Sequence, residues 1–99
     1  EWISSIEVEN VATGHAKVAE AAVIGRIHDK WGERPLLIVV KAPGEEPSPE
    51  ELKAYLEGKI AKWWIPDDVQ FIDDMPHTAT GKIQKTALRD LFADYRFPA

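Results

Sequence analysis

The sequence has 99 residues, 44% of them hydrophobic and 29% charged, which is the balance of one small globular domain. A formal net charge of −5 argues against a general nucleic-acid-binding protein, because such proteins use basic surface to displace counterions from phosphates. The chain has no cysteine and only three histidines, which excludes disulfides and predicts no metal site. No apolar run approaches the roughly 20 residues of a membrane-spanning helix and no signal segment is visible, so we expect no transmembrane segment and a cytoplasmic protein.

The first predicted element is a helix that begins near Ser5. Ser4 and Glu7 have the spacing of a capping box, in which the two side chains bond to the free backbone N–H groups of the first turn. Gly14 is expected to end this helix.

Two strands are predicted next. Residues 18–27 have an ambiguous period, because the alanines suit a helix whereas Val23 and Ile24 before Gly25 suit a strand, and we expect a strand. Residues 36–40 are apolar, rich in β-branched side chains and bounded by prolines, which predicts a buried strand paired with the first one.

The clearest local signal marks a second helix. Ser48 is placed as its cap, Pro49 occupies the first helical position, and Glu51 is placed to reach back to the cap. Its apolar face is predicted from residues at helical spacing, which are Leu52, Tyr55, Leu56 and Ile60.

The last third of the sequence predicts a short strand and a final helix. The strand covers residues 69–72, and residues 73–76 turn the chain into a loop. The helix is predicted from Leu88, Leu91, Phe92 and Tyr95. Strands interleaved with helices predict an α+β domain, with a small mixed sheet of about three strands flanked by helices.

The loop of residues 76–82 combines a conformationally free glycine, two hydroxyls and an ammonium group. A phosphate-binding P-loop is excluded by spacing, because it requires a glycine where Pro76 stands and a hydroxyl residue where Ile83 stands. From the residues alone, Lys82 is either a cation for an anionic ligand or a solvated surface lysine. The segment from His77 to Arg89 has three cations and no carboxylate, which favours a small anion.

The pattern Pro76-x-Thr78-x-x-Gly81-Lys82 resembles the closing motif of the adenylate-forming superfamily, which includes acyl-CoA synthetases, luciferases and peptide-synthetase adenylation domains. Further resemblances follow in the family's order at residues 1–9, 23–35 and 62–66. Within the superfamily, the loop sequence His-Thr-Ala-Thr-Gly-Lys at residues 77–82 and the Trp-Trp pair at residues 63–64 are most similar to those of medium- and long-chain fatty-acid CoA ligases and methylmercaptopropionate CoA ligases.

The resemblance implies an ATP-dependent acyl-CoA ligase, which converts a carboxylate and ATP into acyl-AMP and then transfers the acyl group to CoA. It assigns Lys82 to the first step, where the lysine bridges the substrate carboxylate and the α-phosphate, with Thr80 and Gly81 supporting the loop. ATP, Mg²⁺ and CoA are implied as substrates or cosubstrate of the full enzyme, with none bound by this domain alone.

The resemblance also implies a domain organisation. Residues 1–99 are expected to form the C-terminal lid domain, preceded by a hinge and a large N-terminal domain that binds ATP and the acyl group. The sequence begins with Glu1 and its one methionine is Met75, which agrees with the expectation that a further segment precedes residue 1. We therefore expect the 99-residue chain alone to be inactive.

For the second step the family's C-terminal domain rotates and presents a different face to CoA. The candidates on that face are Glu1, Trp2, Trp31 and Trp64. Each tryptophan has the alternative interpretation of a partly buried packing residue.

Two further hypotheses remain open. Related enzymes are switched off by acetylation of the matching lysine, which implies a protein lysine acetyltransferase as a partner acting on Lys82. From a different class, the chain is a free-standing module that uses exposed tryptophans and the basic loop to bind a protein or an anion. The three histidines form no catalytic triad, and His77 adds local positive charge when protonated.

Overall fold

The computed structural model describes residues 5–28, 30 and 32–95. This part of the chain forms three α-helices, one 3₁₀ turn and three strands. In chain order these elements are α1 (Ser5–Thr13), β1 (Val18–His28), β2 (Gly32–Lys41), α2 (Pro49–Leu56), the turn η1 (Lys62–Trp64), β3 (Asp68–Phe71) and α3 (Lys85–Leu91).

The sheet has the order β1-β2-β3. β1 and β2 are antiparallel, with a register that runs from Val18 opposite Lys41 to His28 opposite Gly32. β2 and β3 are parallel, from Leu36 opposite Asp68 to Val39 opposite Phe71. The predicted α+β class with a three-stranded mixed sheet is therefore confirmed, and both long strands extend beyond their predicted ends because they pair with each other along the whole hairpin.

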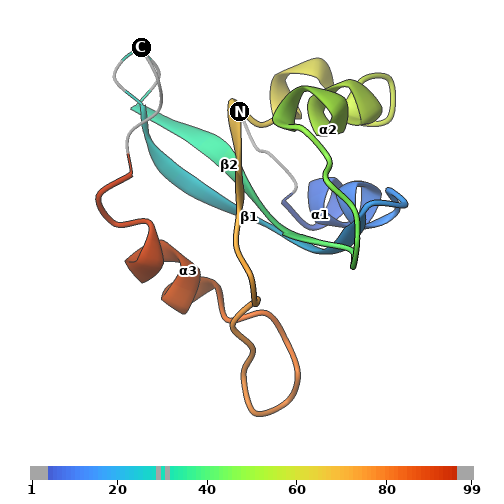
Figure 1. Cartoon of the computed structure of the whole chain (residues 1–99). Coiled ribbons are helices and arrows are strands. Elements are labelled where there is room, and N and C mark those ends of the chain that lie inside the picture. Colours follow the sequence, from blue (N-terminus) through green and yellow to red (C-terminus); the bar gives the residue numbers. More distant parts are fainter. Residues whose placement is uncertain (1–4, 29, 31, 96–99) are drawn as a thin grey trace.

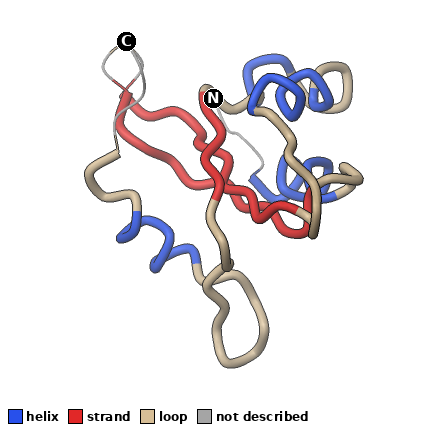
Figure 2. Tube along the Cα trace, viewed as in Figure 1, coloured by secondary structure: helices blue, strands red, loops and turns tan. Residues whose placement is uncertain are grey.

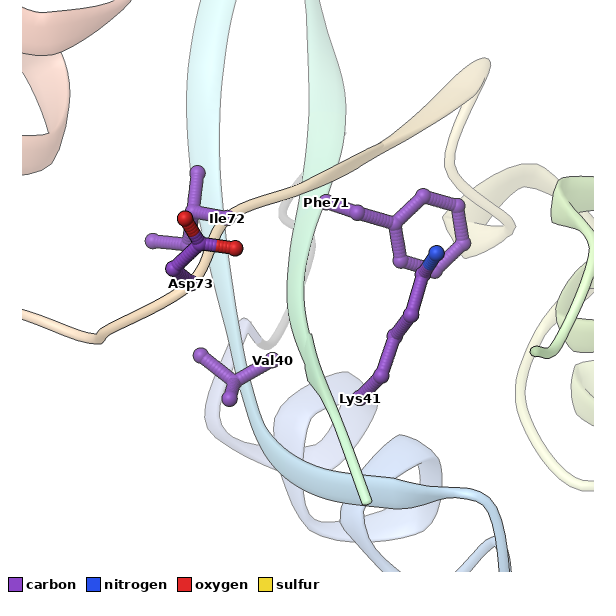
Figure 3. A pocket seen from close by; sticks show the side chains of 5 residues that line it. All are labelled: Val40, Lys41, Phe71, Ile72 and Asp73. Atoms are coloured by element: carbon purple, nitrogen blue, oxygen red, sulfur yellow. The ribbon is translucent and has the colours of Figure 1, made fainter. Parts of the chain in front are cut away.

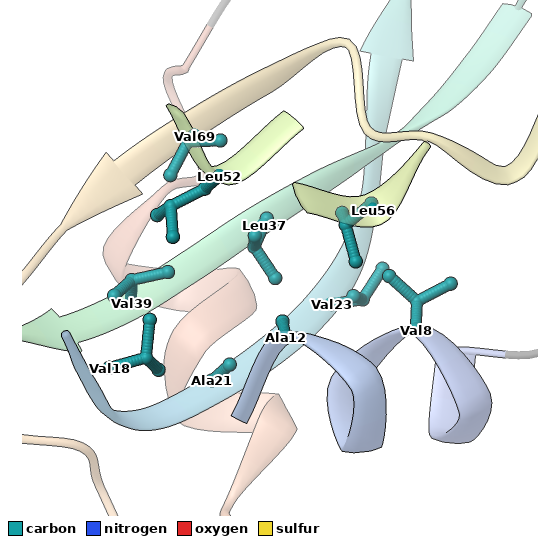
Figure 4. Close-up of a cluster of buried hydrophobic side chains, with 10 residues drawn as sticks. All are labelled: Val8, Ala12, Val18, Ala21, Val23, Leu37, Val39, Leu52, Leu56 and Val69. Carbon is teal, nitrogen blue, oxygen red and sulfur yellow. The ribbon is translucent and has the colours of Figure 1, made fainter. Parts of the chain in front are cut away.

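Helices cover both faces of the sheet. In Figure 1, α1 and α2 lie on one side of the β1-β2 hairpin and α3 lies on the other. The helix-side cluster, drawn in Figure 4, fills the space between the sheet and the first two helices. Its buried members are Val8, Ala12, Val18, Ala21, Val23, Leu37, Val39, Leu52, Leu56 and Val69. Along β2 the cluster residues Leu37 and Val39 alternate with those of the opposite face, as the two-residue period of a strand requires. In β1, Val18 and Ala21 are three residues apart because the register shifts between Val18 and Glu20.

A second set of buried residues, the loop-side cluster, lies on the face covered by α3. Its members are Ala22, Ile24, Leu36, Ile38, Met75 and Leu88. Leu88 is fully buried and anchors α3, while Met75 is buried at the point where the chain leaves β3 for the loop of residues 76–84. This cluster fixes both ends of that loop against the sheet.

The predicted start of α2 is confirmed in detail. The Oγ of Ser48 accepts a hydrogen bond of 3.0 Å from the backbone N–H of Glu51, and Pro49 occupies the first helical turn. The predicted end of α1 is also observed, since the N–H of Gly14 donates to the carbonyl oxygen of Val11 at 3.1 Å. The capping residue predicted for α1, Ser4, lies outside the described residues.

The apolar faces predicted for the second and third helices extend beyond the ends of these helices in the structure. α2 ends at Leu56, because the chain turns at Gly58 with a φ of +80°. Ile60 packs on the helix-side cluster from beyond the helix. α3 ends at Leu91, whose side chain is 62% exposed rather than buried. The aromatic residues Phe92 and Tyr95 reach the loop-side cluster from the turn that follows α3.

Candidate functional site

Residues 76–84, here called the lysine loop, form a closed loop that extends away from the sheet. It is the orange segment between β3 and α3 in Figure 1 and the large tan loop in Figure 2. The N–H of Gln84 donates to the carbonyl oxygen of Pro76 at 2.8 Å, and His77 and Ile83 form an antiparallel bridge. These contacts close the loop at its base, so that residues 78–82 form its tip.

The backbone of the tip is fixed by its own hydrogen bonds. The N–H of Thr78 donates to the carbonyl oxygen of Lys82 at 2.7 Å, and the N–H of Gly81 donates to that of Thr78 at 2.9 Å. The hydroxyls of Thr78 and Thr80 are 2.9 Å apart. Gly81 has a φ of +86°, which is the left-handed region where glycine carries no Cβ penalty. The glycine thus permits the turn that brings Lys82 to the tip.

Lys82 is exposed, and no carboxylate in the described part of the chain forms an ion pair or hydrogen bond with it. Lys85 differs, since its Nζ lies 2.6 Å from Oε2 of Glu9. The three cations predicted to form one anion-binding stretch are therefore not equivalent, because a carboxylate already neutralises Lys85. The third, Arg89, is exposed on α3.

Glu9 joins three elements at the outer edge of the sheet. The same Oε2 that contacts Lys85 accepts a hydrogen bond of 2.7 Å from the backbone N–H of Val23. β1 is an edge strand, so this N–H has no strand partner on that side. The Glu9 carboxylate therefore connects α1, β1 and the first residue of α3.

A second carboxylate contacts the base of the lysine loop. The Nε2 of His77 lies 2.6 Å from Oε2 of Glu20 on β1. The sequence did not indicate either carboxylate as part of the site, because Glu9 and Glu20 stand far from the loop in the chain and no motif connects them with it.

The tryptophans predicted to face CoA are only partly described. Glu1, Trp2 and Trp31 lie outside the described residues. Trp64 is partly buried and packs against the helix-side cluster, as the packing interpretation predicts. Trp63, which was not among the candidates, is 55% exposed. The more accessible aromatic ring of the pair is thus Trp63.

Arg34 holds the tryptophan turn η1 in place. Its Nε donates to Oδ1 of Asp67 at 2.7 Å, and its terminal nitrogen donates to the carbonyl oxygens of Trp63 at 3.1 Å and Ile65 at 3.3 Å. These bonds connect the β2 strand to both sides of the turn. The Trp63 ring is therefore exposed on a fixed backbone.

A shallow pocket of about 290 Å³ lies where β2 and β3 end (Figure 3). It is lined by Val40, Lys41, Phe71, Ile72 and Asp73. The only cation in this lining, that of Lys41, lies 4.9 Å from the centre of the Phe71 ring and 2.9 Å from Oε1 of Glu46. Since that cation is already paired, we assign no ligand to the pocket.

Within residues 5–28, 30 and 32–95, no group of three His, Asp or Glu side chains is arranged to hold a metal ion. None of the helices in the same residues has the length and apolar character required to cross a membrane.

The family model of the AMP-binding enzyme C-terminal domain matches residues 7–82. A 3-methylmercaptopropionyl-CoA ligase from Ruegeria lacuscaerulensis is 60% identical over 95% of the chain, and a long-chain-fatty-acid–CoA ligase from Thermus thermophilus is 49% identical over 96%. Among solved structures, a fatty acyl CoA synthetase from Mycobacterium tuberculosis superposes with a TM-score of 0.89 over 97% of the chain at 35% identity. The chain spans 17% to 19% of the length of these three relatives.

Proposed function

The chain belongs to the AMP-binding enzyme C-terminal domain family, and from this membership we propose that it is the C-terminal domain of an ATP-dependent acyl-CoA ligase. The enzyme would use a carboxylic acid, ATP and CoA as substrates, with acyl-AMP as the intermediate. The relatives are ligases that act on fatty acids or 3-methylmercaptopropionate, which favours this function over a free-standing binding module. A larger N-terminal domain would provide the ATP and acyl sites.

The observation that carries the proposal is the state of Lys82. Its ammonium group stands at the tip of a backbone-fixed loop, exposed and without an ionic partner in the described part of the chain. Lys85 in the same basic segment differs, because it pairs with Glu9 and joins α3 to α1. Lys82 is therefore available to a ligand provided from outside this domain.

The chemistry of the first half-reaction requires such a cation. The carboxylate oxygen attacks the α-phosphorus and pyrophosphate leaves, so that negative charges approach one another in the transition state. A preorganised cation in a water-poor cleft stabilises that charge, and removal of one such group typically costs about 10²- to 10³-fold in rate. Lysine supplies a compact charge on a flexible stem. We assign no step to a magnesium ion held by this chain, because the described residues provide no ligand set for it.

The test is Lys82→Ala in the complete enzyme. Carboxylate-dependent release of pyrophosphate from ATP should fall by about 10²-fold or more, whereas thioester formation from supplied acyl-AMP should stay near the wild-type rate. Lys59→Ala, which removes an exposed lysine that contacts the Tyr55 ring outside the lysine loop, serves as the control. An equal loss of both half-reactions would refute the assigned role.

For the second half-reaction we propose that the tryptophan turn η1 lies on the CoA-facing surface, together with Glu1, Trp2 and Trp31. Trp64 is partly buried, so within this turn the exposed ring of Trp63 is the better candidate for stacking on adenine. Trp63→Ala should raise the KM for CoA and leave pyrophosphate release unchanged.

We also propose that acetylation of Lys82 inactivates the first step, since it would remove the charge of an exposed side chain. Incubation with acetyl-CoA and a protein lysine acetyltransferase from the same cell should yield a modified Lys82 by mass spectrometry. An unmodified lysine under those conditions contradicts this regulation.

A further inference from the structure

We infer that the contact between Glu20 and His77 is a latch that positions the lysine loop, so that both residues act on the first half-reaction through Lys82. This inference rests on the proposed function of Lys82. Neither side chain is assigned contact with the substrates, and we therefore describe both as positioning residues.

The lysine loop is held mainly by hydrogen bonds within itself. The backbone hydrogen bonds of residues 76–83 all join one part of the loop to another, as the pairs from Thr78 to Lys82 and from Gln84 to Pro76 do, whereas the carbonyl oxygen of Gln84 accepts from Ala87 and Leu88 in α3. Among the described residues, the only hydrogen bond or ion pair that joins residues 77–82 to another element is that between His77 and Glu20. The internal bonds keep the shape of the loop, and packing of Ile83 on the loop-side cluster holds its base. The contact with Glu20 adds the polar contact that sets the direction of the loop relative to the sheet.

Glu20 lies next to an irregularity in β1. The register shifts between Val18 and Glu20, which indicates an irregularity of the bulge type at Ala19. A bulge changes the face to which the following side chains point. Glu20 thereby joins Ala22 and Ile24 on the face that carries the loop-side cluster, where its carboxylate reaches the imidazole of His77.

The contact between Glu20 and His77 is short but exposed to solvent. The two atoms are 2.6 Å apart, but both side chains are more than a third exposed. Exposed ion pairs are weak, and their loss shifts an equilibrium by about twofold to fivefold. Such a contact contributes little to the stability of the fold, yet it is strong enough to bias the orientation of an exposed loop.

The test compares Glu20→Ala, His77→Ala and the double variant in the complete enzyme. Each single variant should lower the rate of pyrophosphate release about twofold to fivefold, without changing thioester formation from supplied acyl-AMP. Because the two residues act through one contact, the double variant should be no slower than the slower single variant. The control is Glu46→Ala, which removes an exposed contact with Lys41 that does not involve the lysine loop and should leave both half-reactions unchanged.

A second readout does not depend on activity. Trypsin cleavage after Lys82 should be faster in all three latch variants than in the control, because a freely reorienting loop enters the active site of the protease more readily. Mass spectrometry of the resulting fragment measures the rate of cleavage. Glu20→Gln, which keeps the size of the side chain, should shift both readouts in the same direction. Melting temperatures close to that of the wild type would show that the variants fold.

The outcomes separate this inference from the proposed function. If Lys82→Ala abolishes pyrophosphate release while both single variants retain the wild-type rate, the latch is wrong and the role of Lys82 stands. If the losses of the two single variants multiply in the double variant, the residues act independently and the latch is also wrong. If Lys82→Ala retains full activity, the proposed function itself fails.

Discussion

The carboxylate of Glu9 in the first helix lies 2.6 Å from the ammonium group of Lys85, the first residue of the last helix. Its second contact, with the N–H of Val23, makes this single side chain a bridge across the edge of the sheet. The side chain of Glu9 is only 16% exposed, so its charge is partly shielded from water.

Replacement of Glu9 by Ala should lower the free energy of unfolding by about 1–3 kcal/mol, because a charged acceptor for a backbone N–H and an ion pair are lost together. Glu9→Gln should cost less, since its side-chain oxygen still accepts from Val23. Denaturant unfolding of both variants measures the difference. Equal losses in the two variants would show that the ion pair between Glu9 and Lys85, rather than the hydrogen bond from Val23, accounts for the lost stability.

Gly81→Ala should reduce pyrophosphate release while changing stability by only about 1–2 kcal/mol, the cost of a left-handed conformation for a residue with a Cβ atom. The φ of Gly81 is +86°, and no neighbouring atom would contact the new methyl group. Gly44→Ala is the matched control, because its φ of +79° gives the same strain in an equally open site away from the lysine loop. The control should lose similar stability and keep its activity; a parallel loss of activity in both variants would contradict this expectation.

Arg34→Met should destabilise the tryptophan turn. The change removes three hydrogen bonds, to the carboxylate of Asp67 and to two backbone carbonyl groups, and we expect a loss of about 2–3 kcal/mol. Tryptophan fluorescence should shift to longer wavelength as the rings become more hydrated, and the KM for CoA should rise. Unchanged fluorescence would show that packing alone holds the turn.

The stability contributed by Glu51 should depend on pH. A hydrogen bond from Lys17 is the largest cause that holds the pKa of the Glu51 carboxyl below its ordinary value of 4.5, and the backbone N–H of Ser48 acts in the same direction. A lowered folded-state pKa means that the contribution is present above about pH 4.5 and disappears as the pH falls through the folded-state value. The melting-temperature difference between wild type and Glu51→Gln should therefore narrow below pH 4.5. A constant difference from pH 7 to pH 3 would contradict it.

Tyr95 should make the fold sensitive to alkali. Burial, together with a hydrogen bond from its hydroxyl to Oδ2 of Asp68, raises the pKa of Tyr95 well above its ordinary value of 10.0. Since the folded state keeps the proton longer than the unfolded state does, this contribution is complete below pH 10 and is lost as the pH rises further. Tyr95→Phe should lower the free energy of unfolding by about 0.5–1.5 kcal/mol at neutral pH. As the pH rises above 10, the variant should lose less stability than the wild type does. An identical alkaline slope in both proteins would contradict this explanation.

The parts of the fold that were predicted from the sequence depend on short-range signals. Ser48 and Pro49 lie next to the helix that they begin, and the apolar runs of β1 and β2 show their burial directly. The ends of α2 and α3 were predicted less well, because apolar residues such as Ile60 and Phe92 continue the helical spacing although the backbone has already turned.

The lysine loop could be found from its motif, but the contacts that hold it could not. His77 and Glu20 are 57 residues apart in the chain. Whether Glu20 points toward the lysine loop depends on the irregular register near Ala19, and a shift of one residue would place its side chain on the opposite face. No sequence pattern in this chain marks that irregularity.

The mixed sheet also sets an order of events in folding. β1 and β2 form a hairpin with a short connection, whereas the parallel pairing of β2 with β3 must wait until residues 42–67, including α2, have crossed over. The lysine loop follows β3 and rests on β1, so it joins two segments that meet only when the sheet is complete. We therefore expect the first half-reaction to recover during refolding with the slowest phase of this domain, after the hairpin has already formed.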